Sequence, residues 1–165
     1  LDTMNLWIEN NYDDLMEVIK KTDILLINEE EILQLTHKNN IEIAAKSLLI
    51  HGLEYIVVKK GSKGSLFVSK NNIESIPAVP EIDVFDPTGA GDSFAGGFLG
   101  SLASTSKYFH IEINKPEDII INAIIVGTAI ASYTVSDFGI NGIKNLELHN
   151  IEKRIKLITD LMKGL

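Results

Sequence analysis

The chain contains no cysteine at any of its 165 positions. A fold held by disulfides and a metal centre held by thiolates are therefore excluded. Its four histidines lie far apart, each without neighbouring ligand-type side chains, so we expect no histidine metal site. They are His37, His51, His110 and His149. The lack of cysteine is compatible with a reducing compartment, and we expect the protein to be cytoplasmic.

Positive charge is scarce. Fifteen lysine and arginine residues stand against 23 aspartates and glutamates, which gives a formal net charge of −8. No basic stripe of the kind that nucleic acid requires is present, so we expect no nucleic-acid partner. The content of hydrophobic residues, 45%, and of charged residues, 23%, is that of a globular protein. A chain of this length fits one domain, which we take as residues 1–165.

Charge is also missing from the segment 119–136, which approaches the length of a membrane-spanning helix. The segment contains several polar residues, however, and Ala123, Gly127 and Ala131 recur at every fourth position. Small residues at that spacing give one helix face on which another backbone can pack closely. We therefore expect a buried core helix and no membrane contact.

Apolar periodicity and breaker residues predict alternating helices and strands. The expected helices are 10–21, 29–35, one capped by Asn39 or Asn40 and running to His51, 91–101, 116–134 and 147–162. The expected strands are 23–28, 55–58, 66–68, 73–76 after a hairpin at Asn71-Asn72, and 82–85. This alternation predicts an α/β fold with three layers, in which helices cover both faces of a mostly parallel sheet.

The most informative segment is 86–98, Asp-Pro-Thr-Gly-Ala-Gly-Asp-Ser-Phe-Ala-Gly-Gly-Phe. Small residues at the start of a helix let a ligand approach the backbone, and the free N–H groups there favour an anion. A carboxylate at such a position suits a base that takes a proton from a hydroxyl while the N–H groups hold a phosphoryl group. Alternatively, Asp92 is only a first-turn carboxylate favoured by the helix dipole.

Two common phosphate motifs do not fit this segment. A Walker-type loop needs a glycine, four intervening residues and then Gly-Lys-Ser/Thr, and no position supplies this pattern. The dinucleotide fingerprint needs a glycine three residues after Gly91, where Phe94 stands.

The whole segment resembles the C-terminal signature of the PfkB (ribokinase-like) family of carbohydrate and nucleoside kinases. The resemblance implies that Gly89, Ala90 and Gly91 form the anion hole and that Asp92 is the catalytic base. It also places Thr88 beside the nucleotide and a monovalent cation such as K⁺ near Asp86. From the residues alone, Asp86 could instead cap the following helix, because Asp-Pro is a common turn opener.

Three further motifs follow the order found in that family. Asn28-Glu29-Glu30-Glu31 resembles its Asn-x-x-Glu motif, which implies that Asn28 and Glu31 organise phosphate and Mg²⁺, Glu31 acting through water. From the sequence alone, these two residues could simply end a strand and begin a helix.

Gly61-Ser62-Lys63-Gly64 resembles the turn that lies along the nucleotide, which implies contacts from Gly61, Lys63 and Gly64. Lys63 could equally be an ordinary solvated lysine. The small-residue run 123–132, with Gly127 at its centre, resembles the helix beside the adenine pocket. Lys59 stands where the family often has threonine, and it could reach a phosphate or point to solvent.

The resemblance implies an ATP- and Mg²⁺-dependent kinase that phosphorylates a hydroxyl of a sugar or nucleoside. We expect the motifs after Asn28, Val58 and Phe85 to line one crevice at the carboxyl ends of the strands. Family members are longer and begin with a lid and much of the acceptor site. We therefore expect this chain to be the C-terminal part of a larger, homodimeric protein, inactive alone. The alternative is a nucleotide-binding or structural module without catalysis.

Overall fold

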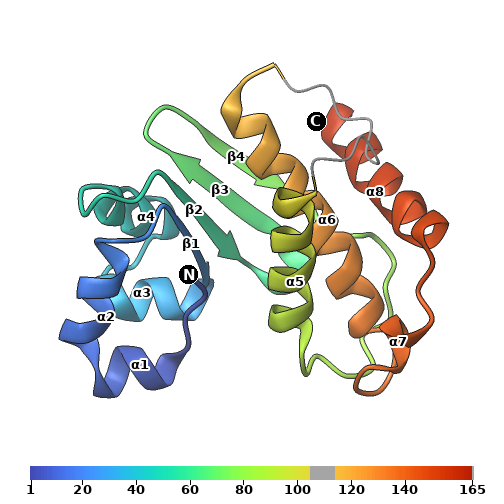
Figure 1. Ribbon diagram of the computed structural model, residues 1–165, viewed down its shortest axis with the longest axis horizontal. Helices are drawn as coiled ribbons and strands as arrows, with labels where there is room; N and C mark the ends of the chain where they lie inside the picture. The colour runs from blue at the N-terminus through green and yellow to red at the C-terminus, as the bar shows by residue number, and fades with distance from the viewer. Residues whose placement is uncertain (105–113, 165) are drawn as a thin grey trace. The chain divides into compact units, whose positions relative to one another are not determined.

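The computed structural model describes residues 1–104 and 114–164, and the chain separates into two compact units. The first unit contains Leu1–Gly61 and Ser65–Ser75, and the second contains Ser62–Gly64 and the chain from Ile76 onward. Figure 1 colours the chain from blue at its N-terminus to red at its C-terminus. Each unit is described by itself below.

The first unit is built on a sheet with helices packed against it (Figure 1). Its helices are α1 (Asn5–Asn10), α2 (Tyr12–Ile19), α3 (Glu29–Thr36) and α4 (Ile41–Leu49). The strands are β1 (Ile24–Asn28), β2 (Tyr55–Lys59), β3 (Ser65–Ser69) and β4 (Ile73–Ile76). Asn40 caps α4 by accepting a hydrogen bond from the N–H of Ile43 at 3.0 Å, which confirms one of the two predicted caps.

The sheet is mixed, with the strand order β1-β2-β3-β4. Strands β1 and β2 are parallel and joined through α3 and α4, and their register pairs Asn28 with Lys59 at the carboxyl ends. Strands β2 and β3 are antiparallel. The predicted hairpin follows β3, where the hydroxyl of Ser69 accepts hydrogen bonds from the N–H groups of Asn71 and Asn72.

Both faces of these strands are buried, as the short unbroken apolar runs predict. Leu25 and Ile27 on β1 face the core formed with α1 to α4, together with Ile56 and Val58 on β2. The alternate side chains are buried as well; they include Leu26, Val57 and Phe67. Burial on both faces is what an α/β sheet requires, and it fixes the register of the strand ends that carry Asn28 and Lys59.

The second unit is mainly helical. Its helices are α5 (Ala90–Ala103), α6 (Pro116–Thr134), α7 (Asn141–Lys144) and α8 (Leu148–Lys163). The 3₁₀ turn Gly61–Lys63 begins in the first unit at Gly61 and continues in the second. Helices α5 and α6 pack without space for side chains at two glycines. A Cβ on Gly97 would lie 3.1 Å from the Cα of Gly127, and a Cβ on Gly127 would lie 2.7 Å from the backbone oxygen of Phe94.

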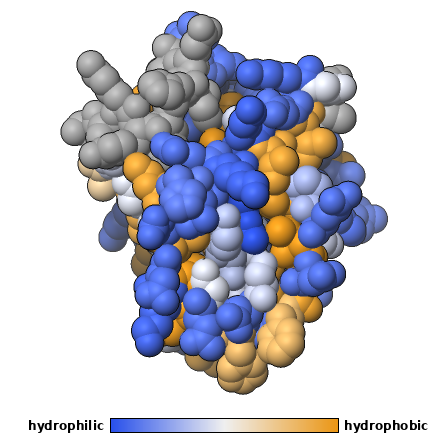
Figure 2. Space-filling view, turned by 90° about the vertical axis from the view of Figure 1, so that its right-hand side faces the viewer, coloured by the Kyte–Doolittle hydropathy of each residue, from blue (hydrophilic) through white to orange (hydrophobic). Residues whose placement is uncertain are grey.

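Among the described residues, α6 is the helix whose length and composition would allow it to cross a membrane. It is packed between α5 and α8, and side chains such as Ile124, Ile125 and Ala129 are buried on more than one of its faces. A core helix passes the same test of length and composition, and this packing supports the predicted core helix. Figure 2 shows the side of the molecule that carries α7 and α8, where hydrophobic side chains lie between hydrophilic ones.

The predicted strand 82–85 is wrong. The described backbone there forms no strand, and Val84 and Phe85 are 59% and 70% exposed. The N–H groups of Phe85 and Asp86 both donate to the backbone oxygen of Val135, just beyond α6. The segment is therefore tied to a loop and not to a neighbouring strand.

Candidate active site

The N-terminus of α5 is open to an anion. Gly89 precedes the helix with a φ of 78°, a left-handed conformation that glycine adopts without steric cost, and no side chain caps the helix. The N–H of Ala90 donates to Pro87. The N–H groups of Gly91 and Asp92 donate to no atom of the described residues. Two unpaired N–H groups at the positive end of a helix can hold phosphoryl oxygens.

Asp92 lies in the first turn of the same helix. Its side chain is exposed and makes no hydrogen bond or ion pair with the described part of the chain. The carboxylate is therefore available to accept a proton from a ligand. It lies in the same first turn of α5 as the N–H groups of Gly91 and Asp92.

A cavity of about 770 Å³ opens beside Asp92 within the second unit. Thr88 and Gly89 line it together with Asp92, and Gly96 and Gly100 extend it along α5. The remaining wall is mainly apolar and comes from α6, α7 and α8; it includes Val126, Ile130, Ile140, Ile143, Leu148 and Ile151. A concave apolar site with a few polar groups at one end is typical of a small-molecule site.

Asp86 connects two loops at the edge of this cavity. One carboxylate oxygen accepts the N–H of Thr88 at 2.9 Å, and the other accepts the N–H of Gly139 at 3.3 Å. The N–H and hydroxyl of Thr88, followed by the N–H of Gly139, hold the pKa of Asp86 below its usual value. Asp86 does not cap α5, so that alternative is wrong. The cation site near Asp86 stays a prediction.

Thr134 and Ser93 form a contact at the cavity that sequence reasoning missed. The buried hydroxyl of Thr134 donates to the hydroxyl oxygen of Ser93 at 2.7 Å, and both residues line the cavity. The contact joins the last turn of α6 to the first turn of α5. No sequence signal could identify it, because the two residues lie 41 positions apart.

Gly127 has a packing role in this structure. Its missing side chain lets α6 approach Phe94 on α5, and Gly127 does not line the described cavity, whereas its neighbour Val126 does. A contact of Gly127 with the nucleotide stays a prediction. The repeat of small residues correctly predicted a close helix contact.

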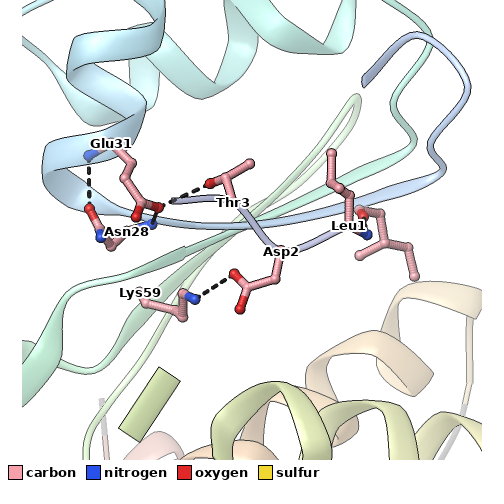
Figure 3. Close-up of polar contacts among 7 residues, drawn as sticks. Leu1, Asp2, Thr3, Asn28, Glu31 and Lys59 are labelled. Atoms are coloured by element: carbon pink, nitrogen blue, oxygen red, sulfur yellow. Dashed lines mark hydrogen bonds and ion pairs between the residues drawn. The ribbon is translucent and has the colours of Figure 1, made fainter. Parts of the chain in front are cut away.

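In the first unit, Asn28 and Glu31 form a reciprocal capping box at the start of α3 (Figure 3). The amide oxygen of Asn28 accepts the N–H of Glu31 at 2.8 Å, and a carboxylate oxygen of Glu31 accepts the N–H of Asn28 at 3.1 Å. The structural alternative for these two residues is thus present in full. It leaves open a further role for Glu31, whose second oxygen accepts no hydrogen bond from the described residues.

The availability of this second carboxylate oxygen determines whether Glu31 is suited to bind Mg²⁺. In the parts of the chain that the structure describes, no cluster of three or more acidic or histidine side chains could hold a metal ion directly. Mg²⁺ keeps several of its waters when it binds with phosphates and needs only one or two carboxylates. A single carboxylate with one oxygen unused fits a hydrated Mg²⁺ held through water.

Lys59 pairs with Asp2, which neither alternative for Lys59 foresaw. Its ammonium lies 2.6 Å from a carboxylate oxygen of Asp2, and the two side chains are 18% and 32% exposed (Figure 3). The pair lies at the carboxyl end of β2, in register with Asn28. The positive charge of Lys59 is thus balanced by Asp2 within the first unit.

The Gly61–Gly64 turn has the backbone that its glycines predict. Gly61 and Gly64 have φ values of 57° and 81°, and a Cβ on Gly64 would lie 2.1 Å from the backbone oxygen of Ile76. Lys63 is exposed. Contacts of Gly61, Lys63 and Gly64 with a nucleotide stay predictions, as does one crevice shared by all the motifs.

The described features define an α/β protein with a helix N-terminus open to an anion, an unpaired carboxylate and an apolar cavity beside it. Residues 3–145 match the family described as pfkB family carbohydrate kinase. The chain therefore belongs to the pfkB family of carbohydrate kinases.

Named relatives agree with this assignment. A cytidine kinase of Thermococcus kodakarensis is 38% identical over 53% of this chain and 32% of its own length. A nucleoside kinase of Methanocaldococcus jannaschii is 32% identical over 76% of this chain and 36% of its own length. The chain thus spans about a third of the length of these curated relatives.

Solved structures show the ribokinase-like fold. The crystal structure of the M. jannaschii nucleoside kinase, a member of the ribokinase family, has a TM-score of 0.70 and 25% identity, covering 94% of this chain and 46% of that one. An E. coli protein described as a ribokinase II, in complex with ATP and Mg²⁺, has a TM-score of 0.68 and 27% identity, covering 87% and 42%. The predicted family and fold class are confirmed.

Proposed function

We propose that the full-length protein transfers the γ-phosphoryl group of ATP to a hydroxyl of a sugar or nucleoside. One observation carries this proposal: the carboxylate of Asp92 and the N–H groups of Gly91 and Asp92, none of which has a partner among the described residues, lie in one helix turn at the edge of an apolar cavity. This arrangement within the second unit supports roles for Asp92 as the general base, for the N–H groups as the phosphoryl site and for the cavity as the pocket of the ATP adenosine.

In this proposal Asp92 accepts the proton of the acceptor hydroxyl as its oxygen attacks the γ-phosphorus. Within the Gly89–Asp92 turn, the N–H groups of Gly91 and Asp92 stabilise the charge on the transferred phosphoryl group, and the bond to the β-phosphate oxygen breaks to release ADP. The apolar wall holds the base of ATP, and Thr88 and Gly89 lie at the end nearer the phosphates.

Mg²⁺ would neutralise charge on the phosphates when bound. Glu31 would hold it through water, and Asn28 would position Glu31 through the capping box. K⁺ near Asp86 is a further proposal. The carboxylate there accepts the N–H groups of Thr88 and Gly139 and the hydroxyl of Thr88, which leaves one of its roughly four lone-pair positions for a cation.

The names of the relatives guide the choice of acceptors to test. The two relatives described above are a cytidine kinase and a nucleoside kinase, and others include fructokinases and ribokinases. The test is a screen of nucleosides, starting with cytidine, and then of sugars, in which ADP release by the full-length protein is measured with MgATP. We expect at least one acceptor to stimulate ADP release. If none does, the protein is a nucleotide-binding module without catalysis.

A further inference from the structure

Glu31 is held by more than its capping box. Glu31 as a whole is 5% exposed, and the oxygen that accepts the N–H of Asn28 also accepts the hydroxyl of Thr3 at 3.0 Å. Figure 3 shows the Thr3 hydroxyl directed at this carboxylate. A capping box is complete without such a donor, so the contact from Thr3 requires its own explanation.

The backbone of Thr3 is held in place by β1. The N–H of Leu26 donates to the backbone oxygen of Leu1 at 2.8 Å, and Asp2 forms a parallel bridge with Leu26. Residues 1–3 thus run beside β1 toward its carboxyl end. Thr3 is one residue beyond the bridge, where a hydroxyl can reach the start of α3.

A second contact fixes the same segment from the other strand end. Asp2 pairs with Lys59 at the end of β2, while Thr3 bonds Glu31 at the end of β1 (Figure 3). Residues 1–3 therefore tie together the two neighbouring strand ends that carry family motifs. The two donors on one oxygen of Glu31 restrict the rotation of its side chain and leave the other oxygen unused.

We propose that Thr3 is a positioning residue that fixes the carboxylate of Glu31 so that its other oxygen can hold hydrated Mg²⁺. This inference rests on the proposed function. Residues that orient a metal-organising carboxylate typically change metal affinity by about 10- to 100-fold when they are replaced.

The test is the gain in ATP affinity that Mg²⁺ provides. ATP is titrated into the full-length protein in a calorimeter, once in the presence of Mg²⁺ and once in the presence of a chelator, and the gain is the ratio of the two affinities. Thr3→Val removes the hydroxyl and keeps the shape, and we expect the gain to fall about tenfold or more. Thr3→Ser keeps the hydroxyl and should stay within about threefold of the wild type. Thr36→Val removes a hydroxyl at the other end of α3, where it bonds Ile32, and should leave the gain unchanged.

Several results would overturn the positioning role. Thr3→Val could keep the full gain, or Thr3→Ser could lose as much as Thr3→Val, which would assign the effect to packing. A wild-type protein that binds ATP equally well without Mg²⁺ would also overturn it. If Thr3→Val does not fold, Thr3→Ala replaces it in the same comparison. Magnesium-dependent binding without phosphorylation of any acceptor would count against the proposed function alone.

Discussion

Gly127→Ala should destabilise the protein although alanine is the better helix former. The new Cβ would lie 2.7 Å from the backbone oxygen of Phe94 and 3.2 Å from its ring. A backbone oxygen inside a helix cannot move by itself, so α5 and α6 must separate. Overpacking of this kind costs about 1–3 kcal/mol, and the gain in helix propensity offsets about 0.5–1 kcal/mol of it. We expect a net loss of up to about 2.5 kcal/mol in the free energy of unfolding.

Gly96→Ala is the matched control on α5. No atom of the described residues lies within 4 Å of a Cβ built there, so only the gain in helix propensity remains, up to about 1 kcal/mol. Urea unfolding of both full-length variants, followed by far-ultraviolet circular dichroism, measures the difference. If both substitutions change the free energy of unfolding in the same direction and by similar amounts, the claim that α5 and α6 leave no space for a side chain at Gly127 is refuted.

Two further predictions concern pH and the isolated chain. The pKa of Asp86 is lowered from 3.8 by folding, so its stabilising effect is complete above that pH and is lost as the pH falls through the folded value. The stability difference between wild type and Asp86→Asn, from urea unfolding across pH, should therefore shrink below about pH 4, and a constant difference would refute it. These 165 residues alone should bind ATP weakly in a titration but should not phosphorylate sugars. We expect them not to hold the acceptor hydroxyl against Asp92, and such positioning is worth about 7–11 kcal/mol. Efficient, saturable kinase activity of these residues would contradict this.

Local signals predicted much of the fold. The helix Pro116–Thr134 has the predicted bounds, because Pro116 suits the first turn and the apolar run has no break. Helix α4 ends at Leu49, two residues before the predicted end, and Gly52 follows with a φ of 109°. The strand 82–85 was wrong because β propensity does not show whether a partner strand exists. There, Val135 supplied a loop partner instead.

The sequence likewise predicted only those features of the site that depend on residues close together in the chain. The start of α5 and the Asn28–Glu31 capping box depend on residues a few positions apart, so the sequence shows them directly. The pairs Lys59–Asp2 and Glu31–Thr3 join residues 57 and 28 positions apart, and only the strand register brings them together. Contacts of this kind depend on the tertiary structure, and no local pattern encodes them.

The central claim is that Asp92 is the general base of phosphoryl transfer. The direct measurement compares wild type and Asp92→Asn in the full-length protein, with kcat taken from acceptor-dependent ADP release and ATP affinity from titration. The amide has nearly the same shape but cannot accept the proton, so kcat should fall about 100-fold or more while ATP affinity changes little. An Asp92→Asn protein with a kcat within a few fold of the wild type would contradict the account.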